Sequence, residues 1–225
     1  GREPVPWKPT DVALATAFLF ASFLVIQILL GLVIGVGDVE ARDIPTPLLA
    51  GAVEGLMLVA VWVFGIKRYH ARWRSLGLRQ PEARWVLTLP WLALFGSLAF
   101  ASIYSATVIA IGVELLEPTP LPGDVLGHGF ERLLNTLIIV LWGPFTEEVF
   151  FRGFLLAALI PGFGAIRAVV ISSLIFAAAH MMLSTMLPLF VTGLLLSWLY
   201  VKTRSIWPPL TAHAAQNLLA VSIVS

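Results

Sequence analysis

Apolar runs long enough to cross a bilayer alternate with short polar segments along the whole chain. A membrane-spanning helix needs about 20 mainly apolar residues. The predicted spans are residues 11–36, 46–66, 85–112, 133–160, 168–183, 186–201 and 206–224. We therefore predict an all-α, polytopic transmembrane helix bundle of about seven spans (about six to eight), forming one membrane domain over residues 1–225. A break at Gly143-Pro144 would make the eighth span, because proline removes a backbone donor.

The first apolar run follows a polar, proline-rich start at residues 1–10. This run is longer than the core of a signal peptide, and no small-residue cleavage site ends it convincingly. We therefore expect it to be retained as the first span. Because the sequence begins with Gly1 rather than Met, we also expect that a short N-terminal piece precedes it.

The composition agrees with a lipid environment. The chain is 59% hydrophobic and 12% charged, with a mean hydropathy of +0.93, whereas soluble domains average about 45–50% apolar and about 25% charged residues. The chain has no cysteine, which excludes disulfides, thiolate metal sites and a cysteine nucleophile. The bilayer is therefore an expected partner, and no nucleic-acid partner is expected.

The charges separate by loop. Basic residues lie in the loop 67–84 and in the loops of the same parity; they are Arg2, Lys8, Lys67, Arg68, Arg72, Arg74, Arg79, Arg84, Arg167, Lys202 and Arg204. Acidic residues mark the opposite loops, at positions 38–43 and 114–131. The positive-inside rule then predicts a multi-pass protein of the cell membrane with a cytoplasmic N-terminus and an external C-terminus. The loop 67–84 itself reads as a topology signal that contacts lipid headgroups, or as a short interfacial helix.

A carboxylate pair and an arginine interrupt the fourth predicted span. Each charge at membrane depth costs about 2.5–3.5 kcal/mol on the lenient insertion scales. Glu148 and Arg152 are four residues apart and share a helix face, so they are expected to pair. Glu147 points about 100° away and has no local partner. We expect Glu147 to be reached by water from the cytoplasmic side, because a dry carboxyl group would be protonated and useless as a base.

Three more polar residues lie on later predicted spans, and together with Glu147 they suit hydrolysis. Glu147 with His180 is placed to deprotonate a water molecule, and His213 with Asn217 to donate hydrogen bonds to a developing oxyanion. Equally, Glu147, His180 and His213 are the ligand types of catalytic zinc sites. Metal-free and zinc-assisted activation of water both stay open.

These residues form three motifs, which resemble those of the CPBP family, the intramembrane CAAX-protease and bacteriocin-processing (Abi-like) group. The motifs are Glu147-Glu148-Val149-Phe150-Phe151-Arg152, Phe176-Ala177-Ala178-Ala179-His180 and His213-Ala214-Ala215-Gln216-Asn217. The resemblance covers the catalytic core, about residues 133–219, and each motif falls on a predicted span.

The resemblance implies that Glu147 and His180 activate water, that His213 and Asn217 stabilise the oxyanion, and that Glu148 and Arg152 support the site. Members of the family are described both as metalloproteases and as metal-free glutamate proteases. The expected function is an intramembrane endopeptidase acting on a peptide or membrane-protein substrate. Eukaryotic relatives trim prenylated CAAX proteins, but the short loops here look bacterial.

Two other classes of function compete with the enzyme. One is a catalytically inactive scaffold or partner-binding protein, and the other is a small proton-coupled transporter that uses Glu54 of the second predicted span. Glu54 is expected more often as a protonated packing residue than as an ion-linked one. The enzyme is favoured because every motif position is filled and no paired broken helices are visible. Substrate, cleaved bond, metal and oligomeric state stay open.

Overall fold

The computed structural model of the 225-residue chain describes residues 5–36, 46–118 and 126–224, and these residues form helices and turns without a strand. The helices are α1 (Pro9–Val36), α2 (Thr46–Val61), α3 (Ala83–Ile111), α4 (Gly129–Leu137), α5 (Gly143–Glu147), α6 (Ala157–Ala179), α7 (Leu183–Thr203) and α8 (Trp207–Val224). Short 3-10 turns, η3 (Trp73–Leu76) and η4 (Glu114–Leu116), and wider π-helical segments, η2 (Trp62–Lys67), η5 (Ile138–Trp142) and η6 (Glu148–Leu156), connect or extend them.

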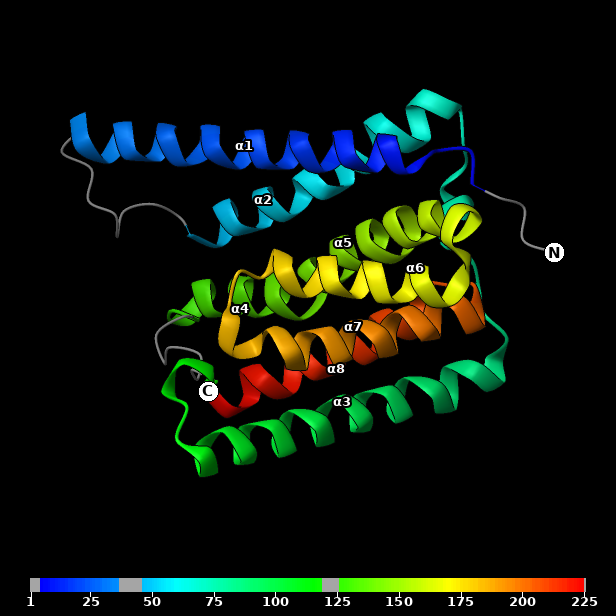
Figure 1. The fold of residues 1–225 in the computed structure, drawn as a ribbon. Coiled ribbons are helices and arrows are strands. Elements are labelled where there is room, and N and C mark those ends of the chain that lie inside the picture. The colour runs from blue at the N-terminus through cyan, green and yellow to red at the C-terminus, as the bar shows by residue number, and fades with distance from the viewer. Residues whose placement is uncertain (1–4, 37–45, 119–125, 225) are drawn as a thin grey trace.

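The prediction of a polytopic helical bundle is confirmed. Within the described ranges, five helical segments are long and apolar enough to cross a membrane: Pro9–Val33, Pro47–Lys67, Leu87–Ile111, Gly129–Ala179 and Leu183–Thr203. The helices run side by side, and α1 begins at the end of the bundle opposite to that where α8 finishes (Figure 1). Such an arrangement is what an odd number of crossings requires.

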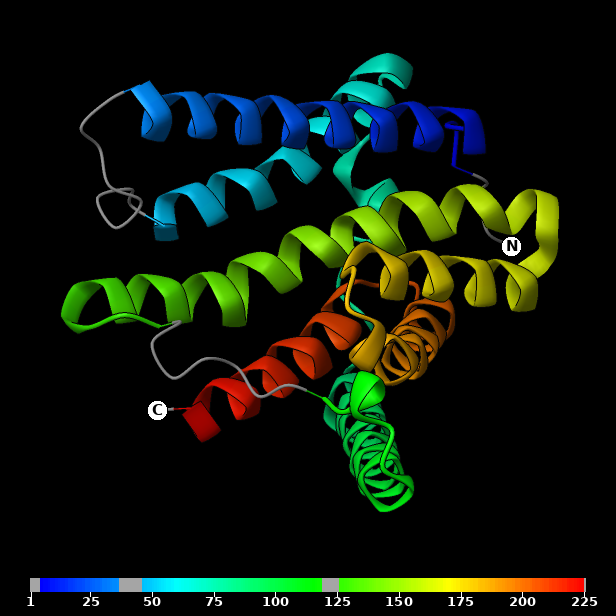
Figure 2. The same cartoon turned by 60° about the vertical axis from the view of Figure 1, so that its left-hand side comes forward.

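The long segment Gly129–Ala179 is a helical hairpin rather than one rod. The chain stays helical through Gly143 and Pro144, so the break considered at this dipeptide does not occur. It reverses instead at Gly164, whose φ of 75° and ψ of 162° are readily reached only without a Cβ atom. The segment before Gly164 and the segment after it lie antiparallel (Figures 1 and 2). These two legs account for the fourth and fifth apolar runs.

The motif-bearing hairpin lies at the centre of the bundle. The pair α1 and α2 lies on one side of it, and α3, α7 and α8 lie on the other (Figure 2). Trp7 ties the start of α1 to the centre by donating from Nε1 to the Phe154 carbonyl at 3.0 Å. Asp11 adds an ion pair with Arg68 at 3.2 Å and accepts from the Tyr69 hydroxyl at 2.7 Å. That hydrogen bond raises the pKa of the Tyr69 phenol.

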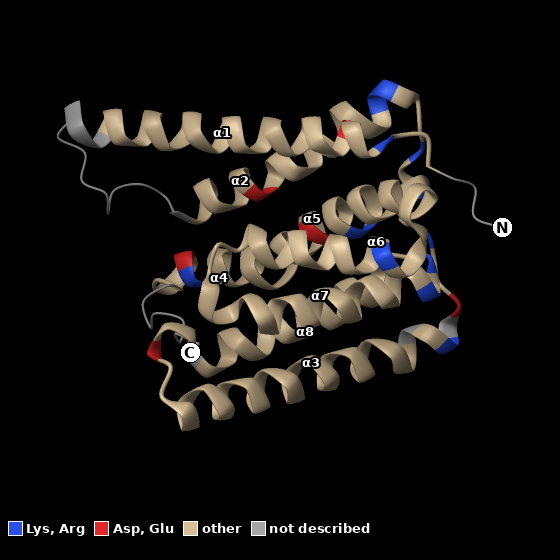
Figure 3. Cartoon of the chain, viewed as in Figure 1, with Lys and Arg blue, Asp and Glu red and all other residues tan. Residues whose placement is uncertain are grey.

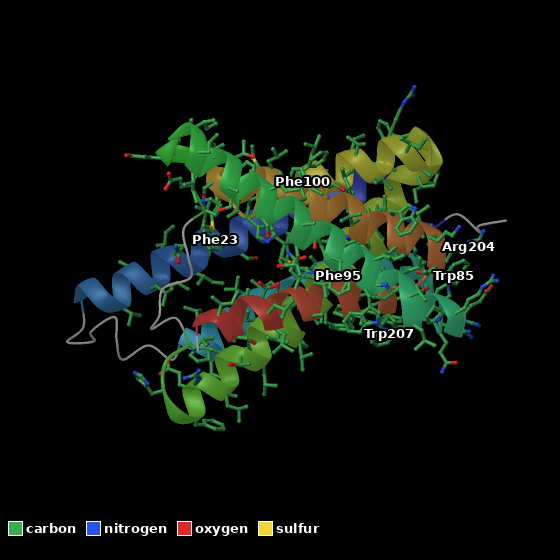
Figure 4. All side chains as sticks on the ribbon, turned by 90° about the horizontal axis from the view of Figure 1, so that it is seen from below. Phe23, Trp85, Phe95, Phe100, Arg204 and Trp207 are labelled. Atoms are coloured by element: carbon green, nitrogen blue, oxygen red, sulfur yellow. The ribbon has the colours of Figure 1, made fainter. Side chains whose placement is uncertain are left out.

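Lys and Arg residues gather at the end of the bundle where α1 begins, and acidic residues dominate the opposite end (Figure 3). Trp85 lies between two cations of the basic end, with Arg84 Cζ at 4.5 Å and Lys202 Nζ at 5.3 Å from its ring centre. Trp85, Arg204 and Trp207 lie near this end, while Phe95 and Phe100 follow α3 toward the other (Figure 4). Tryptophan beside cations is typical of a membrane–water interface. The predicted acidic loop at positions 38–43 lies outside the described residues, and the cytoplasmic N-terminus stays a prediction.

The loop 67–84 does not lie simply on the surface. Leu76 is fully buried and packs under the end of the hairpin, where a Cβ atom on Gly153 would come within 2.6 Å of the Leu76 carbonyl oxygen. Backbone bonds join this loop to the turn before α8, since Ile206 N–H donates to Gly77 at 3.0 Å. The basic loop therefore closes one end of the bundle, and only part of it, with Trp73 exposed, is free for headgroups.

Candidate active site

The first motif lies where α5 passes into the π-helical segment η6. Glu148 and Arg152 have side chains with 0% exposure, and Arg152 Nη1 lies 3.1 Å from Glu148 Oε1. The guanidinium group also lies 4.4 Å from the ring centre of Phe176, the first residue of the second motif. A buried guanidinium needs both a counter-charge and a polarisable neighbour. The pair Glu148–Arg152 thus anchors the second motif to the first.

His213 of α8 contacts both glutamates of the first motif. Its Nδ1 atom lies 3.0 Å from Glu148 Oε1, and its Nε2 atom lies 3.6 Å from Glu147 Oε2. Glu147 is partly accessible, with 15% side-chain exposure, whereas Glu148 is sealed. From the sequence, Glu147 was predicted to activate water together with His180. The structure instead places His213 directly beside Glu147, because α8 packs against α5.

His180 ends the short leg of the hairpin. Its Nδ1 atom lies 2.8 Å from the Phe176 carbonyl oxygen; a carbonyl only accepts, so Nδ1 carries the proton and Nε2 keeps a lone pair. The Phe176 ring separates the two imidazoles, with its centre 4.8 Å from that of His180 and 6.0 Å from that of His213. His180 is half-buried and lies within electrostatic reach of His213. It therefore belongs to the same polar cluster.

Asn217, for which the resemblance implied a role in stabilising the oxyanion, makes a hydrogen bond to the backbone of the motif helix. Its Nδ2 group donates to the Ile139 carbonyl at 2.8 Å. In the π-helical register Gly143 N–H donates to Ile138, so the next residue, Pro144, would donate to Ile139 but has no N–H. Asn217 supplies the missing hydrogen bond. Of its two amide hydrogens, one is thereby committed to holding the helix that carries Glu147.

Glu54 of α2 also lies at this cluster, although the sequence analysis treated it mainly as a packing residue. Thr146 Oγ1 donates to Glu54 Oε2 at 2.9 Å, and Glu54 is within electrostatic reach of Glu147, His180 and His213. The feature of the sequence that could have pointed to Glu54 was a carboxylate within an apolar span, next to Gly55. Only the packing of α2 on α5 links it to the motifs.

The fit of a metal ion was tested on the donor atoms. Among the described His, Asp and Glu side chains, no three are placed as the ligands of one metal ion. Each imidazole already uses Nδ1, His180 on the Phe176 carbonyl and His213 on Glu148. The expected zinc ligands Glu147, His180 and His213 thus do not form a three-ligand site in this arrangement.

Burial changes along the first motif at Glu147. Residues 148–159 are all buried, and the loop 67–84 packs against this part of the hairpin through Leu76. Glu147, Glu54 and His180 are partly exposed. The opening of the site toward the cytoplasm stays a prediction.

Several polar atoms of the cluster lack a hydrogen-bond partner within the described ranges. They are Glu147 Oε2, Glu148 Oε2 and the three guanidinium nitrogens of Arg152, whose contact with Glu148 is an ion pair. Buried polar groups without partners are costly and are usually satisfied by water or a ligand. The cluster therefore has donors and acceptors available for water or for a peptide group.

Comparisons with known proteins point to the same class of protein. Residues 129–219 match the family described as type II CAAX prenyl endopeptidase, Rce1-like. A Bacillus subtilis (strain 168) protein described as "Putative membrane peptidase YdiL" is 32% identical over 139 residues, which are 61% of this chain and 54% of that relative. The alignment thus spans about half the length of the curated relative. No solved structure matches the chain.

Proposed function

We propose that the protein, whose residues 129–219 match the Rce1-like family of CAAX endopeptidases, is an intramembrane endopeptidase with Glu147 as its hydrolytic base. The observation that carries the proposal is the position of His213 between a sealed glutamate and an accessible one. If the Glu148–Arg152 pair served only packing, it would not explain why a second, partly exposed carboxylate, that of Glu147, lies beside the same His213 imidazole.

The proposed reaction uses one water molecule. Glu147 accepts a proton from water while the water oxygen bonds to the carbonyl carbon of the substrate, and the carbonyl oxygen becomes an oxyanion. Glu147 then returns the proton to the amide nitrogen as the C–N bond breaks, which leaves a carboxyl product and an amine. The Nε2 lone pair of His180 is free to accept a hydrogen bond from the water.

The other motif residues stabilise charge or hold the site in place. Glu148 holds His213 at Nδ1, and when both ring nitrogens of His213 carry a proton its Nε2 edge donates to the oxyanion. Arg152 pairs with the buried carboxylate of Glu148. Asn217 holds the proline-containing turn before Glu147, and its second amide hydrogen is available to the substrate.

The substrate is proposed to be a peptide or membrane-protein segment that enters the bilayer. The matched family is named for prenylated CAAX substrates, whereas the Bacillus relative is named only as a membrane peptidase. A prenylated protein and a membrane-protein segment both present a peptide bond at or below the membrane surface. The apolar outer surface and the spans suit a reaction inside the membrane, here that of a bacterial cell.

The test uses purified protein in liposomes with fluorogenic peptides. One peptide ends in a farnesylated CAAX sequence, a second has the same sequence without the lipid, and a third is an apolar transmembrane peptide. We expect cleavage of at least one of them by the wild type and none by Glu147→Gln. Equal cleavage by both proteins would contradict the role of Glu147, and no cleavage by the wild type would favour an inactive scaffold.

The same assay addresses the metal. Activity that survives chelation, with no stoichiometric metal by elemental analysis, supports the metal-free reaction. Loss of activity on chelation, with return on adding Zn²⁺, would show that the imidazoles rearrange to bind a metal.

A further inference from the structure

We propose that Glu54 is a positioning residue of the hydrolytic site, where its carboxyl group, held by Thr146, sets the placement and the electrostatic surroundings of Glu147. The inference rests on the proposed function and adds a residue from outside the three motifs. The matched range, residues 129–219, does not include Glu54, so the family match gives it no role.

The first support is a direct contact with the turn that ends at Glu147. Thr146, which precedes Glu147 in the chain, is fully buried and donates from Oγ1 to Glu54 Oε2 at 2.9 Å. A Cβ atom on Gly143 would lie 3.9 Å from the Glu54 carboxyl carbon, so the carboxyl group lies against the start of α5. Glu54 therefore lies against Gly143 at the start of α5 and accepts a hydrogen bond from Thr146 near its end.

The second support is that packing holds Glu54 in this place. Trp142 Nε1 donates to the Gly51 carbonyl at 2.8 Å, which sets the register of α2 against the motif helix. A Cβ atom on Gly51 would lie 3.3 Å from Ile138, and one on Gly55 would lie 3.7 Å from Trp142. Small residues allow such close approach of helices in a membrane. Glycines one turn before and one residue after Glu54 therefore bring α2 close to α5.

The third support is the charged surroundings. Besides Glu147, Glu54 is within electrostatic reach of His180 and His213. Four parts of the fold thus bring ionisable groups together: α2, the junction of α5 with η6, the end of α6, and α8. A carboxyl group kept only for packing needs one hydrogen-bond partner. It does not need other ionisable groups around it. The placement of Glu54 beside the base and both imidazoles is what a site residue requires.

The experiment compares four variants in the liposome assay. Glu54→Gln keeps the size and an acceptor for Thr146 but removes the charge, and Thr146→Val removes the donor but keeps the shape. Thr146→Ser keeps the donor, and Glu114→Gln removes an exposed carboxylate far from the motifs in sequence. We expect Glu54→Gln and Thr146→Val to lower kcat by roughly tenfold or more with KM unchanged, and Glu54→Gln to keep its Tm. The Ser variant and Glu114→Gln should match the wild type.

A second measurement needs no substrate. Infrared spectroscopy follows the carboxyl band that disappears in Glu147→Gln, and the pH midpoint of that band should move by about half a unit or more in Glu54→Gln. The charged or titratable groups within electrostatic reach of Glu147 are Glu54, Glu148, Arg152 and His213, so the other three are left in place. The band should stay unmoved in Glu114→Gln.

The two measurements separate the possible failures. If the wild type cleaves no peptide, the proposed function fails, and the infrared midpoint alone decides the role of Glu54. Full turnover of Glu54→Gln, or an unmoved band, overturns the inference. If Glu54→Gln does not fold, the two Thr146 variants decide, and turnover and band positions equal to the wild type in both would also overturn it.

Discussion

His213 and Glu148 form a buried contact, with Nδ1 3.0 Å from Oε1 and side-chain exposures of 7% and 0%. Glu148 Oε1 also receives Arg152 at 3.1 Å, so one carboxylate oxygen holds an imidazole and a guanidinium together. The opposite edge of the imidazole faces Glu147. The adjacent glutamates thus differ in their surroundings, since Glu148 is sealed within the cluster and Glu147 is partly exposed.

This difference predicts that two matched variants both lose activity but differ in stability. Glu148→Gln leaves Arg152 without its counter-charge in a sealed site, and breaking a buried pair typically costs about 3–5 kcal/mol. We expect a clearly lower Tm in detergent and loss of activity. Glu147→Gln should lose activity and keep its Tm, because the amide keeps the shape but cannot take a proton. If both variants merely unfold, the cluster is structural.

The hydrogen bond from Asn217 to Ile139 predicts a rescue. Asn217→Leu should destabilise the protein by about 1–3 kcal/mol, because it leaves a carbonyl without a donor. Pro144→Ala restores a backbone N–H one residue after Gly143, and it should recover part of that loss in the double variant. The check is a thermal double-mutant cycle over the two sites. Strictly additive effects would show that the amide and the proline are unrelated.

Gly153 should not tolerate a side chain. A Cβ atom there would lie 2.6 Å from the backbone oxygen of Leu76, and backbone cannot move aside as a flexible side chain can. We expect Gly153→Ala to cost about 1–3 kcal/mol, as overpacking does, and to loosen the loop 67–84 in limited proteolysis. Gly31→Ala in α1, where nothing lies within 4 Å, is the control and should be neutral or slightly stabilising.

Met181 has a left-handed backbone, with φ of 52°, directly after His180. A non-glycine residue in this region stores about 1–3 kcal/mol of strain. Met181→Gly should relieve this strain and so raise Tm. Glycine also makes the unfolded chain more flexible, and where the two effects cancel Tm stays unchanged. A lower activity of the Met181→Gly variant would show that the strained backbone helps to hold His180 in place. A fall in Tm by several degrees would show that the exposed Met181 side chain makes a stabilising contact.

Hydrophobic periods and charge placement were enough to predict a polytopic helical bundle, because each span is a local property of about 20 residues. The i, i+4 pairing of Glu148 with Arg152 was predictable for the same reason, since helix geometry sets it. The three motifs could be recognised as a family pattern from residue types and order alone. A connection between the fourth and fifth spans was predicted from the same pattern, and the chain reverses there at Gly164; the wide π turns were not predicted.

What the sequence by itself determined was the class of fold, and it also gave the three motifs and the family resemblance that they carry. Only the tertiary structure decided which of them touch: His213 rather than His180 beside Glu147, Asn217 on the carbonyl that Pro144 leaves without a donor, and Glu54 against Thr146. These contacts join residues 66 to 92 positions apart in the chain. Their geometry follows from how whole helices pack, which no local pattern of residues encodes.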